Sequence, residues 1–362
     1  MNVLVMETGS FKTFGGAANA SYGIYKFLKK FLNYNVYYFA DFSKIDKSIV
    51  PVSEMELGYD SYDIVLMNSI RDVPFVTRYM NPKKNKRTKF IYTDRGNVLL
   101  NFRKSGVKKL LPKMLARQYL LNSMRSWLDC YVAISAEQYE AAKGFFSKST
   151  KIYYLPIAPA EIYDRVDTEK ENSAVYVGRL DERQKKVSFL IRGIARAKEL
   201  HNGLKGKELL RIAGTGPDKE AYMKLASSLG VADNIRFMGF VEDEELVALY
   251  NSASFFVSAS EWEGMSRTFV EAMACGLPLL INTNNNTLVS LKPREYLVTD
   301  GYNGMVYEYG NIDDFAAKFT RMYNDRRFTK ELSEKAYKYS RNFSLEKNLR
   351  GYKKIMESLY PY

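Results

Sequence analysis

Two carboxylates lie on either side of a predicted helix start, where they could bind a phosphorylated ligand between them. In the stretch EWEGMSRTFVEAMACGLPLL (261–280), Glu263 is in a loop after an apolar strand, and Glu271 is one turn inside the helix expected to begin near Ser266. Free backbone amides at a helix start bind anions such as phosphate. Carboxylates accept paired hydrogen bonds from vicinal hydroxyls, which ribose and hexoses offer. The pattern indicates a site for a nucleotide sugar.

The same stretch has a simpler interpretation. Glu263 could cap the helix, and Glu271 could be a solvent-exposed acid that the helix dipole favours. The helix is expected to end at Gly276, a glycine followed closely by Pro278. This simpler interpretation is less attractive because a second group of residues also indicates phosphate.

That second group is a pair of cations. The stretch VGRLDERQKKVSFLIRG places Arg179 and Lys185 just after a predicted strand, where parallel sheets present ligand-binding groups. Two fixed cations can balance a diphosphate leaving group and stabilise its developing charge. The alternative is an ordinary charged loop, which suits the neighbouring Arg183 and Lys186. Two glycine turns after strands could bring backbone close to an anion, and they contain Gly214 (AGTGP) and Gly15 and Gly16 (GSFKTFGGAANAS).

Composition limits the classes of protein. A chain of 362 residues with 46% hydrophobic residues predicts two globular domains. No apolar run approaches the roughly 20 residues that span a bilayer, and the N-terminus MNVLVMETGSF is not typical of a signal peptide, so we expect a cytoplasmic protein. Cys130 and Cys275 have no metal-ligand spacing, and His201 has no nearby partners for a catalytic triad. We therefore expect no metal and no bound cofactor.

Short apolar runs alternate with amphipathic stretches along the whole chain, which predicts an α/β protein with parallel sheets. A polar, proline-containing segment around residues 157–173 separates two such halves. We predict two doubly wound, Rossmann-like domains, residues 1–160 and 161–342, that face each other across a cleft. A terminal amphipathic helix, about 343–362, is expected to follow Ser344 as its N-cap.

The second half resembles a known family. EGMSRTFVEAMACGLP, preceded by GRLDERQKKV, AGTGP and IRFMGFVEDEEL and followed by DGYNGMVYEYGN, is similar in content and order to retaining glycosyltransferase family 4, whose fold is GT-B. The resemblance implies a retaining transferase that takes a nucleotide-diphosphate sugar and needs no metal. It also implies that the terminal helix crosses back to the first domain.

The resemblance also implies roles for individual residues. Glu271 would accept hydrogen bonds from ribose, Glu263 would contact the donor sugar, and Arg179 and Lys185 would clamp the diphosphate, so that Arg179, Lys185 and Glu263 act in catalysis. The nucleobase would lie near Phe240. The implied donor-binding residues are Gly15, Gly16, Gly214, Phe240, Met265, Ser266, Arg267 and Glu271.

The chain departs from the family pattern in two places. Many relatives have a histidine after a first-domain strand that lines the sugar site, whereas FIYTDRGN has Asp94 and Arg95. Either Asp94 takes part in sugar or acceptor binding or Arg95 binds an anionic group; the alternative for Asp94 is that it caps a turn. Residues 284–286 are asparagines where relatives often have glycines. Because asparagine tolerates left-handed backbone better than most residues, we expect the loop to be kept with altered sugar contacts.

Positive charge is concentrated in the first half. The whole chain has a net charge of +13, and residues 1–165 contain 25 Lys and Arg against 14 Asp and Glu. The basic stretches at 81–89 and 103–127, within residues 81–127, carry apolar residues between the cations and could contact an anionic membrane surface. The alternative is a core helix with a solvated basic side. No nucleic-acid-binding motif is present.

These observations predict an enzyme that moves a sugar from a nucleotide-diphosphate sugar to a glycan, a lipid-linked molecule or another hydroxyl acceptor. The alternative is a catalytically silent protein of the same fold that binds a nucleotide sugar or a partner subunit. The presence of four charged residues favours the enzyme: Arg179, Lys185, Glu263 and Glu271. The missing histidine in the first domain favours the catalytically silent protein.

Overall fold

The structure is a computed structural model that describes residues 1–6, 23–25, 28–29, 34–39, 61–95, 98–100, 112–200, 204, 208–289 and 295–360. Two features singled out in the sequence lie outside the described residues: the glycine turn with Gly15 and Gly16, and His201. Residues 101–111 of the second basic stretch also lie outside them.

The chain forms two compact units. The first consists of Met1–Pro156 together with Glu346–Tyr362, and the second of Ile157–Leu345. The sequence placed the divisions at residues 160 and 343, and the structure places them after Pro156 and after Leu345.

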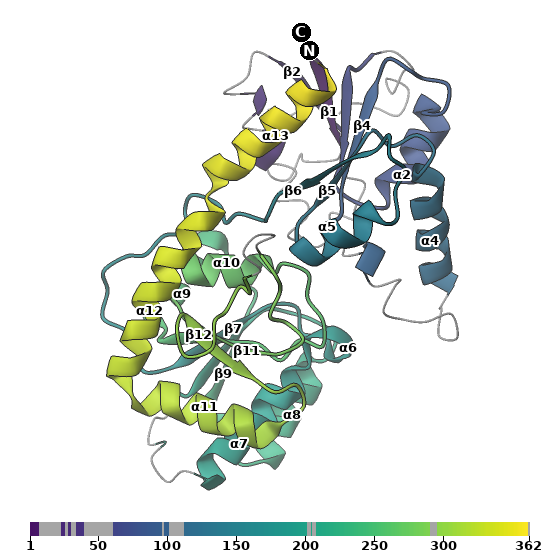
Figure 1. Ribbon diagram of the computed structural model, residues 1–362. Helices are drawn as coiled ribbons and strands as arrows, with labels where there is room; N and C mark the ends of the chain where they lie inside the picture. Colours follow the sequence, from purple (N-terminus) through teal and green to yellow (C-terminus); the bar gives the residue numbers. More distant parts are fainter. Residues whose placement is uncertain are drawn as a thin grey trace. The chain divides into compact units, whose positions relative to one another are not determined.

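The first unit contains a six-stranded parallel sheet with the strand order β2-β1-β3-β4-β5-β6 (Figure 1). Its strands are short and rich in β-branched and aromatic residues, as buried parallel strands usually are. The elements of this unit are β1 (Asn2–Met6), β2 (Asn35–Phe39), β3 (Ile64–Met67), α2 (Asp72–Phe75), the π-helix η2 (Val76–Met80), β4 (Lys89–Thr93), α4 (Pro112–Met124), β5 (Cys130–Ala133), α5 (Ala136–Lys143), β6 (Lys151–Tyr154) and α13 (Leu345–Leu359).

Alternate strand residues of the first unit face opposite sides of the sheet. One set, with Met67, Phe90 and Tyr131, forms a hydrophobic core with α2, η2 and α4. The other side is covered by α13, which buries Leu349 and Ile355 (Figure 1). The inner strands β1, β3, β4 and β5 are almost entirely buried, as the strands of a doubly wound sheet usually are.

Helix α13 is fixed closely to the strands that precede the unit boundary. A Cβ atom at Gly351 would lie 2.4 Å from Cδ1 of Leu155, so only glycine permits this approach without displacing that side chain. At the far end of the helix, the Tyr153 hydroxyl lies 2.8 Å from Oγ of Ser358, and Nζ of Lys151 donates to the Ser358 carbonyl at 2.6 Å. Ser344 is extended directly before α13 begins.

The second unit contains another six-stranded parallel sheet, with the order β12-β11-β10-β7-β8-β9. The order reverses at β7, and Figure 1 draws α7, α8 and α11 on one side of the sheet and α9, α10 and α12 on the other. The elements are β7 (Ala174–Val177), α6 (Glu182–Lys185), α7 (Val187–Leu200), β8 (Leu210–Ala213), α8 (Lys219–Ser228), the 3-10 helix η4 (Ala232–Asn234), β9 (Ile235–Gly239), α9 (Asp243–Ser252), β10 (Phe255–Val257), α10 (Arg267–Ala274), β11 (Leu279–Asn282), β12 (Gly304–Tyr307), α11 (Ile312–Asn324), α12 (Arg326–Ser340) and the 3-10 helix η5 (Arg341–Phe343).

Doubly wound parallel sheets place their ligand sites at the carboxyl ends of the strands, near the point where strand order reverses. In the second unit this edge holds the turns that follow β7, β8, β9 and β10. Most of the charged residues singled out in the sequence belong to these turns or to α10, directly after them.

Candidate active site

The turns after β7 and β8 touch each other through glycines. Gly214 has a φ of +142°, and a Cβ atom there would lie 1.9 Å from the carbonyl oxygen of Gly178. Gly216 packs in the same way, since its Cβ would lie 2.1 Å from the carbonyl oxygen of Leu180. The AGTGP stretch thus supports the backbone from which Arg179 and α6 project.

Helix α6 is one short turn whose two ends are both determined by local sequence. The Asp181 side chain accepts a hydrogen bond from the Arg183 amide at its start. Lys186 ends it in a left-handed conformation, with a φ of 49°, before α7 continues in a new direction. The result places Lys185 in the last turn of α6.

Lys185 and Glu263 form an ion pair, with 2.5 Å between Nζ and Oε1. Both side chains are largely buried, with exposed fractions of 18% and 9%. Sequence reasoning gave them separate roles on a ligand, and the structure brings them together. Because Glu263 is held by Lys185 and α10 has no side-chain cap, Glu263 does not cap the helix.

Gln184 holds the loop that carries Glu263, a function that the sequence analysis missed. Its Nε2 donates to the Trp262 carbonyl at 3.2 Å, and its own carbonyl accepts from the Glu261 amide at 2.8 Å. Nη2 of Arg179 lies 3.0 Å from Oδ2 of Asp181 and is otherwise largely exposed. Arg179 is therefore the more accessible of the two predicted cations.

Glu271 is buried inside α10, with only 3% of its side chain exposed. Nε of Arg267 donates to its Oε1 at 2.5 Å. Burial raises the pKa of Glu271 to about 7, and the opposing effect of Arg267 is smaller. The alternative of a solvent-exposed first-turn acid is therefore wrong.

Two further residues surround this carboxylate, and the sequence analysis missed both. The Tyr163 hydroxyl donates to Oδ1 of Asp243 at 2.8 Å. Burial and then the charge of Glu271 raise the pKa of Tyr163, and Asp243 in turn raises the pKa of Glu271. Tyr163 lies in the segment that was read only as a polar linker, where its aromatic side chain was the one available signal.

The start of α10 presents unused backbone donors. Ser266 is the N-cap residue, but its side chain does not cap the helix, and its Oγ instead lies 3.1 Å from Oγ1 of Thr268. Within the described ranges, the backbone N–H groups of Met265, Ser266 and Arg267 have no hydrogen-bond acceptor. Free amides at a helix start favour an anion. The far end of α10 is as expected, since Gly276 has a φ of +78°.

The asparagine loop after β11 turns without left-handed backbone. None of Asn284, Asn285 and Asn286 has a positive φ, so the loop does not use the conformation that asparagine tolerates. Instead, Oδ1 of Asn282 accepts from the amides of Asn284 and Asn285, at 3.0 and 3.1 Å. The Asn282 side chain thus stabilises a turn that would otherwise depend on the backbone flexibility of glycine.

An aromatic residue directly after β9 is largely exposed to solvent. Phe240 follows Gly239, whose φ is +76°, and 68% of its side chain is exposed. Gly239 also accepts a hydrogen bond from the Gly214 amide at 2.6 Å, which places Phe240 beside the β8 turn. An exposed ring at this position can stack on a planar group.

The first-unit residues have unequal access to ligands. Asp94 is completely buried, and its two oxygens accept hydrogen bonds from the amides of Val98 and Leu99 and from the Tyr131 hydroxyl. It is the turn-capping residue that the sequence left as an alternative. Arg95 is only partly buried and contacts other residues of the same sheet edge.

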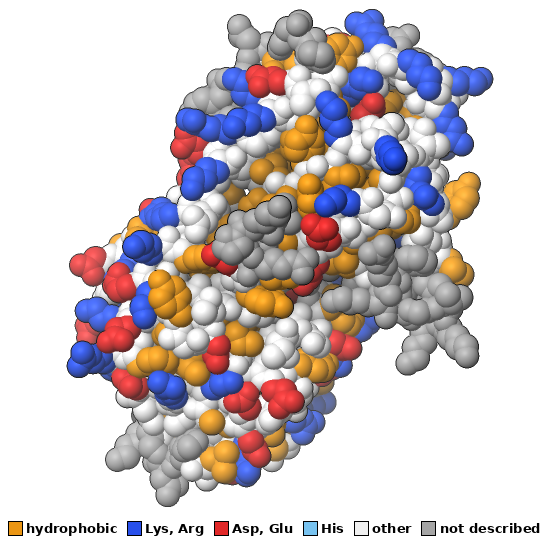
Figure 2. All heavy atoms as spheres, viewed as in Figure 1, with side chains coloured by type: hydrophobic (Ala, Val, Ile, Leu, Met, Phe, Trp, Pro, Cys, Tyr) orange, Lys and Arg blue, Asp and Glu red, His pale blue; other side chains and the backbone are white. Residues whose placement is uncertain are grey.

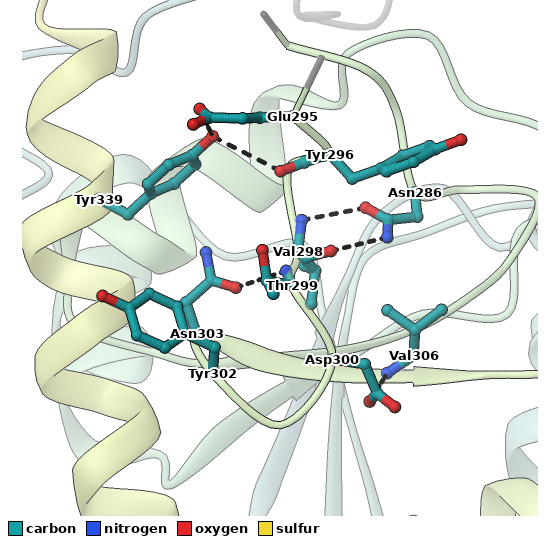
Figure 3. A pocket seen from close by; sticks show the side chains of 10 residues that line it. All are labelled: Asn286, Glu295, Tyr296, Val298, Thr299, Asp300, Tyr302, Asn303, Val306 and Tyr339. Atoms are coloured by element: carbon teal, nitrogen blue, oxygen red, sulfur yellow. Dashed lines mark hydrogen bonds between the residues drawn. The ribbon is translucent and has the colours of Figure 1, made fainter. Parts of the chain in front are cut away.

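One pocket of the second unit, with a volume of about 750 Å³, lies away from these residues (Figure 3). It is lined by Tyr296, Tyr302 and Tyr339 among others, and none of the predicted site residues lines it. The amide side chains drawn in Figure 3 hold the surrounding loop, as Asn286 does by bonding both the amide and the carbonyl of Val298. We assign this pocket no part in the site.

In the part of the chain that the structure describes, no three His, Cys, Asp or Glu side chains converge as a metal site would require. Cys130 and Cys275 are free and buried. Burial raises the pKa of the Cys275 thiol to about 12, which leaves it unreactive at neutral pH.

The chain belongs to the glycosyl transferases group 1 family, whose model matches residues 161–342. It is 27% identical over 203 residues to the lipopolysaccharide 1,6-galactosyltransferase of Salmonella typhimurium, covering 54% of this chain and 53% of that protein. The chain spans about half the length of the curated relatives it matches.

Solved structures show the same architecture. The sucrose-phosphate synthase of Thermosynechococcus elongatus matches with a TM-score of 0.79 at 14% identity, over 99% of both chains. Anabaena HepE, solved in complex with UDP and glucose, matches with a TM-score of 0.77 at 16% identity, over 99% of this chain and 100% of that one. Together with the two parallel sheets, these matches define a two-domain α/β protein of the GT-B fold.

Proposed function

We propose that this chain transfers a sugar from a nucleoside-diphosphate sugar to a hydroxyl group of an acceptor, with retention of anomeric configuration. The observation that carries the proposal is the pair of acid–cation contacts around the start of α10, Lys185 with Glu263 and Arg267 with Glu271. Between them lie the unused backbone amides of that helix start. Family membership and the UDP bound by HepE support the same function.

In the proposed complex, each group of the donor meets a suitable partner. The diphosphate lies at the helix amides with Lys185 and Arg179, because these groups supply positive charge without an ion. Glu271 accepts hydrogen bonds from the ribose diol, and Glu263 accepts from hydroxyls of the sugar. The nucleobase stacks on Phe240.

The proposed reaction is a front-face displacement. The bond between the anomeric carbon and the diphosphate oxygen breaks, and its electron pair leaves with the diphosphate. The acceptor hydroxyl attacks the same face of the sugar, and its proton passes to the departing phosphate oxygen. Lys185 and Arg179 stabilise the charge that develops on the diphosphate, which is an interaction that grows in the transition state.

The direct test measures nucleoside diphosphate released from UDP-, GDP- and ADP-sugars by the purified protein, alongside calorimetric binding of the same donors. We expect one donor to bind and to be turned over slowly by water alone, and we expect Lys185→Ala to lower the rate of release about 100- to 1000-fold while donor still binds. The protein is the catalytically silent alternative if it binds a donor but releases no nucleoside diphosphate when a panel of acceptors is supplied. No binding of any donor would overturn the proposal.

We further propose that the first unit meets an anionic membrane surface where a lipid-linked acceptor would lie. Exposed cations follow the η2 segment, at Lys83, Lys84, Lys86 and Arg87, and α4 exposes Leu115 and Tyr119. Figure 2 shows Lys and Arg side chains over this part of the surface. Within the described residues, no helix is long and apolar enough to cross a bilayer. Cosedimentation with phosphatidylglycerol vesicles, but not with phosphatidylcholine vesicles, is the expected result.

A further inference from the structure

Arg95 projects from the carboxyl edge of the first unit's sheet toward a neighbouring strand end. It lies two residues beyond β4, and Asn68 directly follows β3, which pairs with β4 in parallel. Nε of Arg95 donates to Oδ1 of Asn68 at 3.3 Å, and Nη2 donates to the Tyr352 hydroxyl of α13 at 3.2 Å. The guanidinium is therefore held in one orientation by two neutral groups.

No carboxylate neutralises this cation in the described part of the chain. Arg95 has no ion pair there, whereas Lys185 and Arg267 each have a carboxylate at 2.5 Å. Two acids close to Asn68 and Arg95 in the chain make other hydrogen bonds: Oδ2 of Asp72 accepts from the amides of Asn68 and Ser69, and Asp94 caps the following turn. Among the described residues Nη1 has no hydrogen-bond acceptor, and Arg95 as a whole is only partly buried.

Asn68 provides a second, independent observation. The residue is 1% exposed, and its buried Nδ2 has no hydrogen-bond partner among the residues that the structure describes. Because Oδ1 is fixed by Arg95, the amide cannot turn around to satisfy Nδ2 without breaking that bond. A buried amide donor without an acceptor costs about as much as a lost hydrogen bond, so a native structure normally gives it a partner.

We propose that Arg95 and Asn68 bind an anionic group of the acceptor, a phosphate or a carboxylate. This inference rests on the proposed function and names the class of acceptor. A guanidinium beside an amide donor supplies several N–H groups toward the oxygens of one anion, and arginine is well suited to such paired contacts. The carboxyl edge of a parallel sheet is where such folds bind ligands. The net charge of +11 in residues 1–165 attracts the same class of molecule.

The test is calorimetric binding of small probes to the full chain at low ionic strength. Glycerol 3-phosphate and glucuronate represent the phosphate and the carboxylate, and glycerol and glucose are their neutral counterparts. We expect one of the two anions to bind with a stoichiometry of one and the neutral probes not to bind. Arg95→Met is expected to weaken anion binding about tenfold or more, and Asn68→Leu to weaken it as well.

Matched variants separate the site from general charge. Arg71→Met removes the same charge from an exposed residue close to Asn68 in the chain, and it should leave anion affinity unchanged. Equal losses in Arg71→Met and Arg95→Met, or no binding of either anion to the wild-type protein, would overturn the proposal. Binding of glycerol 3-phosphate alone would identify a phosphorylated acceptor, and binding of glucuronate alone an acidic sugar.

A further variant separates binding from a purely structural role, because Arg95 also braces α13. Tyr352→Phe removes the hydroxyl that contacts Arg95 but keeps the cation, and it should retain anion affinity within about threefold. Loss of anion binding in Tyr352→Phe equal to that in Arg95→Met would show that Arg95 acts only as a brace. Donor binding is measured on the same samples: if donor binds and the anions do not, only this inference fails.

Discussion

Nζ of Lys185 lies 2.5 Å from Oε1 of Glu263, although 78 residues separate them in the chain. The contact joins the last turn of α6 to the loop before α10, and Gln184 adds two hydrogen bonds between the same segments. In the proposed complex, the cation that would bind the phosphate is therefore held by the acid that would bind the sugar. We expect donor binding to change the hydrogen bonds of this pair.

Replacing Lys185 tests this arrangement. We expect Lys185→Ala to lower kcat about 100- to 1000-fold with a smaller change in donor affinity, because the charge that it stabilises develops on the leaving group. Lys186→Ala is the matched control, since Lys186 pairs with Glu261 at 3.3 Å and is more exposed. Steady-state rates of nucleotide release measure both. An equal loss in the two variants would contradict the assigned role of Lys185.

Glu271 should make both stability and ligand binding depend on pH. Its folded-state pKa of about 7 lies above the ordinary value of 4.5, so the folded protein keeps a proton that the unfolded chain has already lost. As pH rises from about 5 to about 8, the free energy of unfolding should fall by about 3 kcal/mol relative to Glu271→Gln. Urea unfolding at several pH values measures this difference, and parallel pH profiles for the two proteins would contradict it.

The same carboxylate should make nucleotide binding stronger at higher pH. The ionised form accepts two hydrogen bonds from a diol, whereas the protonated form must use one oxygen as a donor. We therefore expect affinity for the cognate nucleoside diphosphate to rise as pH passes through about 7 in the wild-type protein and to stay level in Glu271→Gln. Calorimetry across this range is the measurement. An affinity that does not change with pH would argue against a ribose at Glu271.

Gly214 should be intolerant of any side chain. Gly214→Ala puts a Cβ atom against the Gly178 carbonyl at a positive φ, and we expect a loss of about 3 kcal/mol in the free energy of unfolding. Gly230→Ala is the control, because Gly230 also has a positive φ, +66°, but nothing lies within 4 Å of its Cβ position. It should lose only about 1 kcal/mol. Similar losses in both would show that backbone strain, rather than close packing, dominates.

Transfer should proceed without a divalent ion. In the proposed complex, the positive charge near the diphosphate would come from Lys185, Arg179 and the backbone amides at the start of α10 rather than from a metal. We expect EDTA to change the initial rate by less than about twofold once the protein has been dialysed against it. Restoration of a lost rate by Mg²⁺ or Mn²⁺ would contradict this prediction.

Local patterns in the sequence were sufficient to predict that strands and helices alternate along the chain. Short apolar runs alternating with amphipathic stretches indicated parallel sheets, because burial on both faces of a parallel sheet requires such runs. The start and end of α10 followed from Ser266 and Gly276 for similarly local reasons. The hydrogen bonds of the asparagine loop did not follow from local patterns, because the side chain of Asn282 accepts from the backbone there and forms the turn.

The sequence by itself determined which residue types would line the site: carboxylates and cations after strands, at fixed distances from a helix start. Only the tertiary structure decided how they pair. Lys185 forms an ion pair with Glu263, and Tyr163 and Asp243 lie near Glu271. Arg95 donates a hydrogen bond to Asn68 and has no ion pair with a described carboxylate. These contacts depend on which strands are neighbours, because parallel strands far apart in sequence bring their carboxyl ends to one edge. The periodicity of hydrophobic residues within one segment does not tell which strands are adjacent in the sheet.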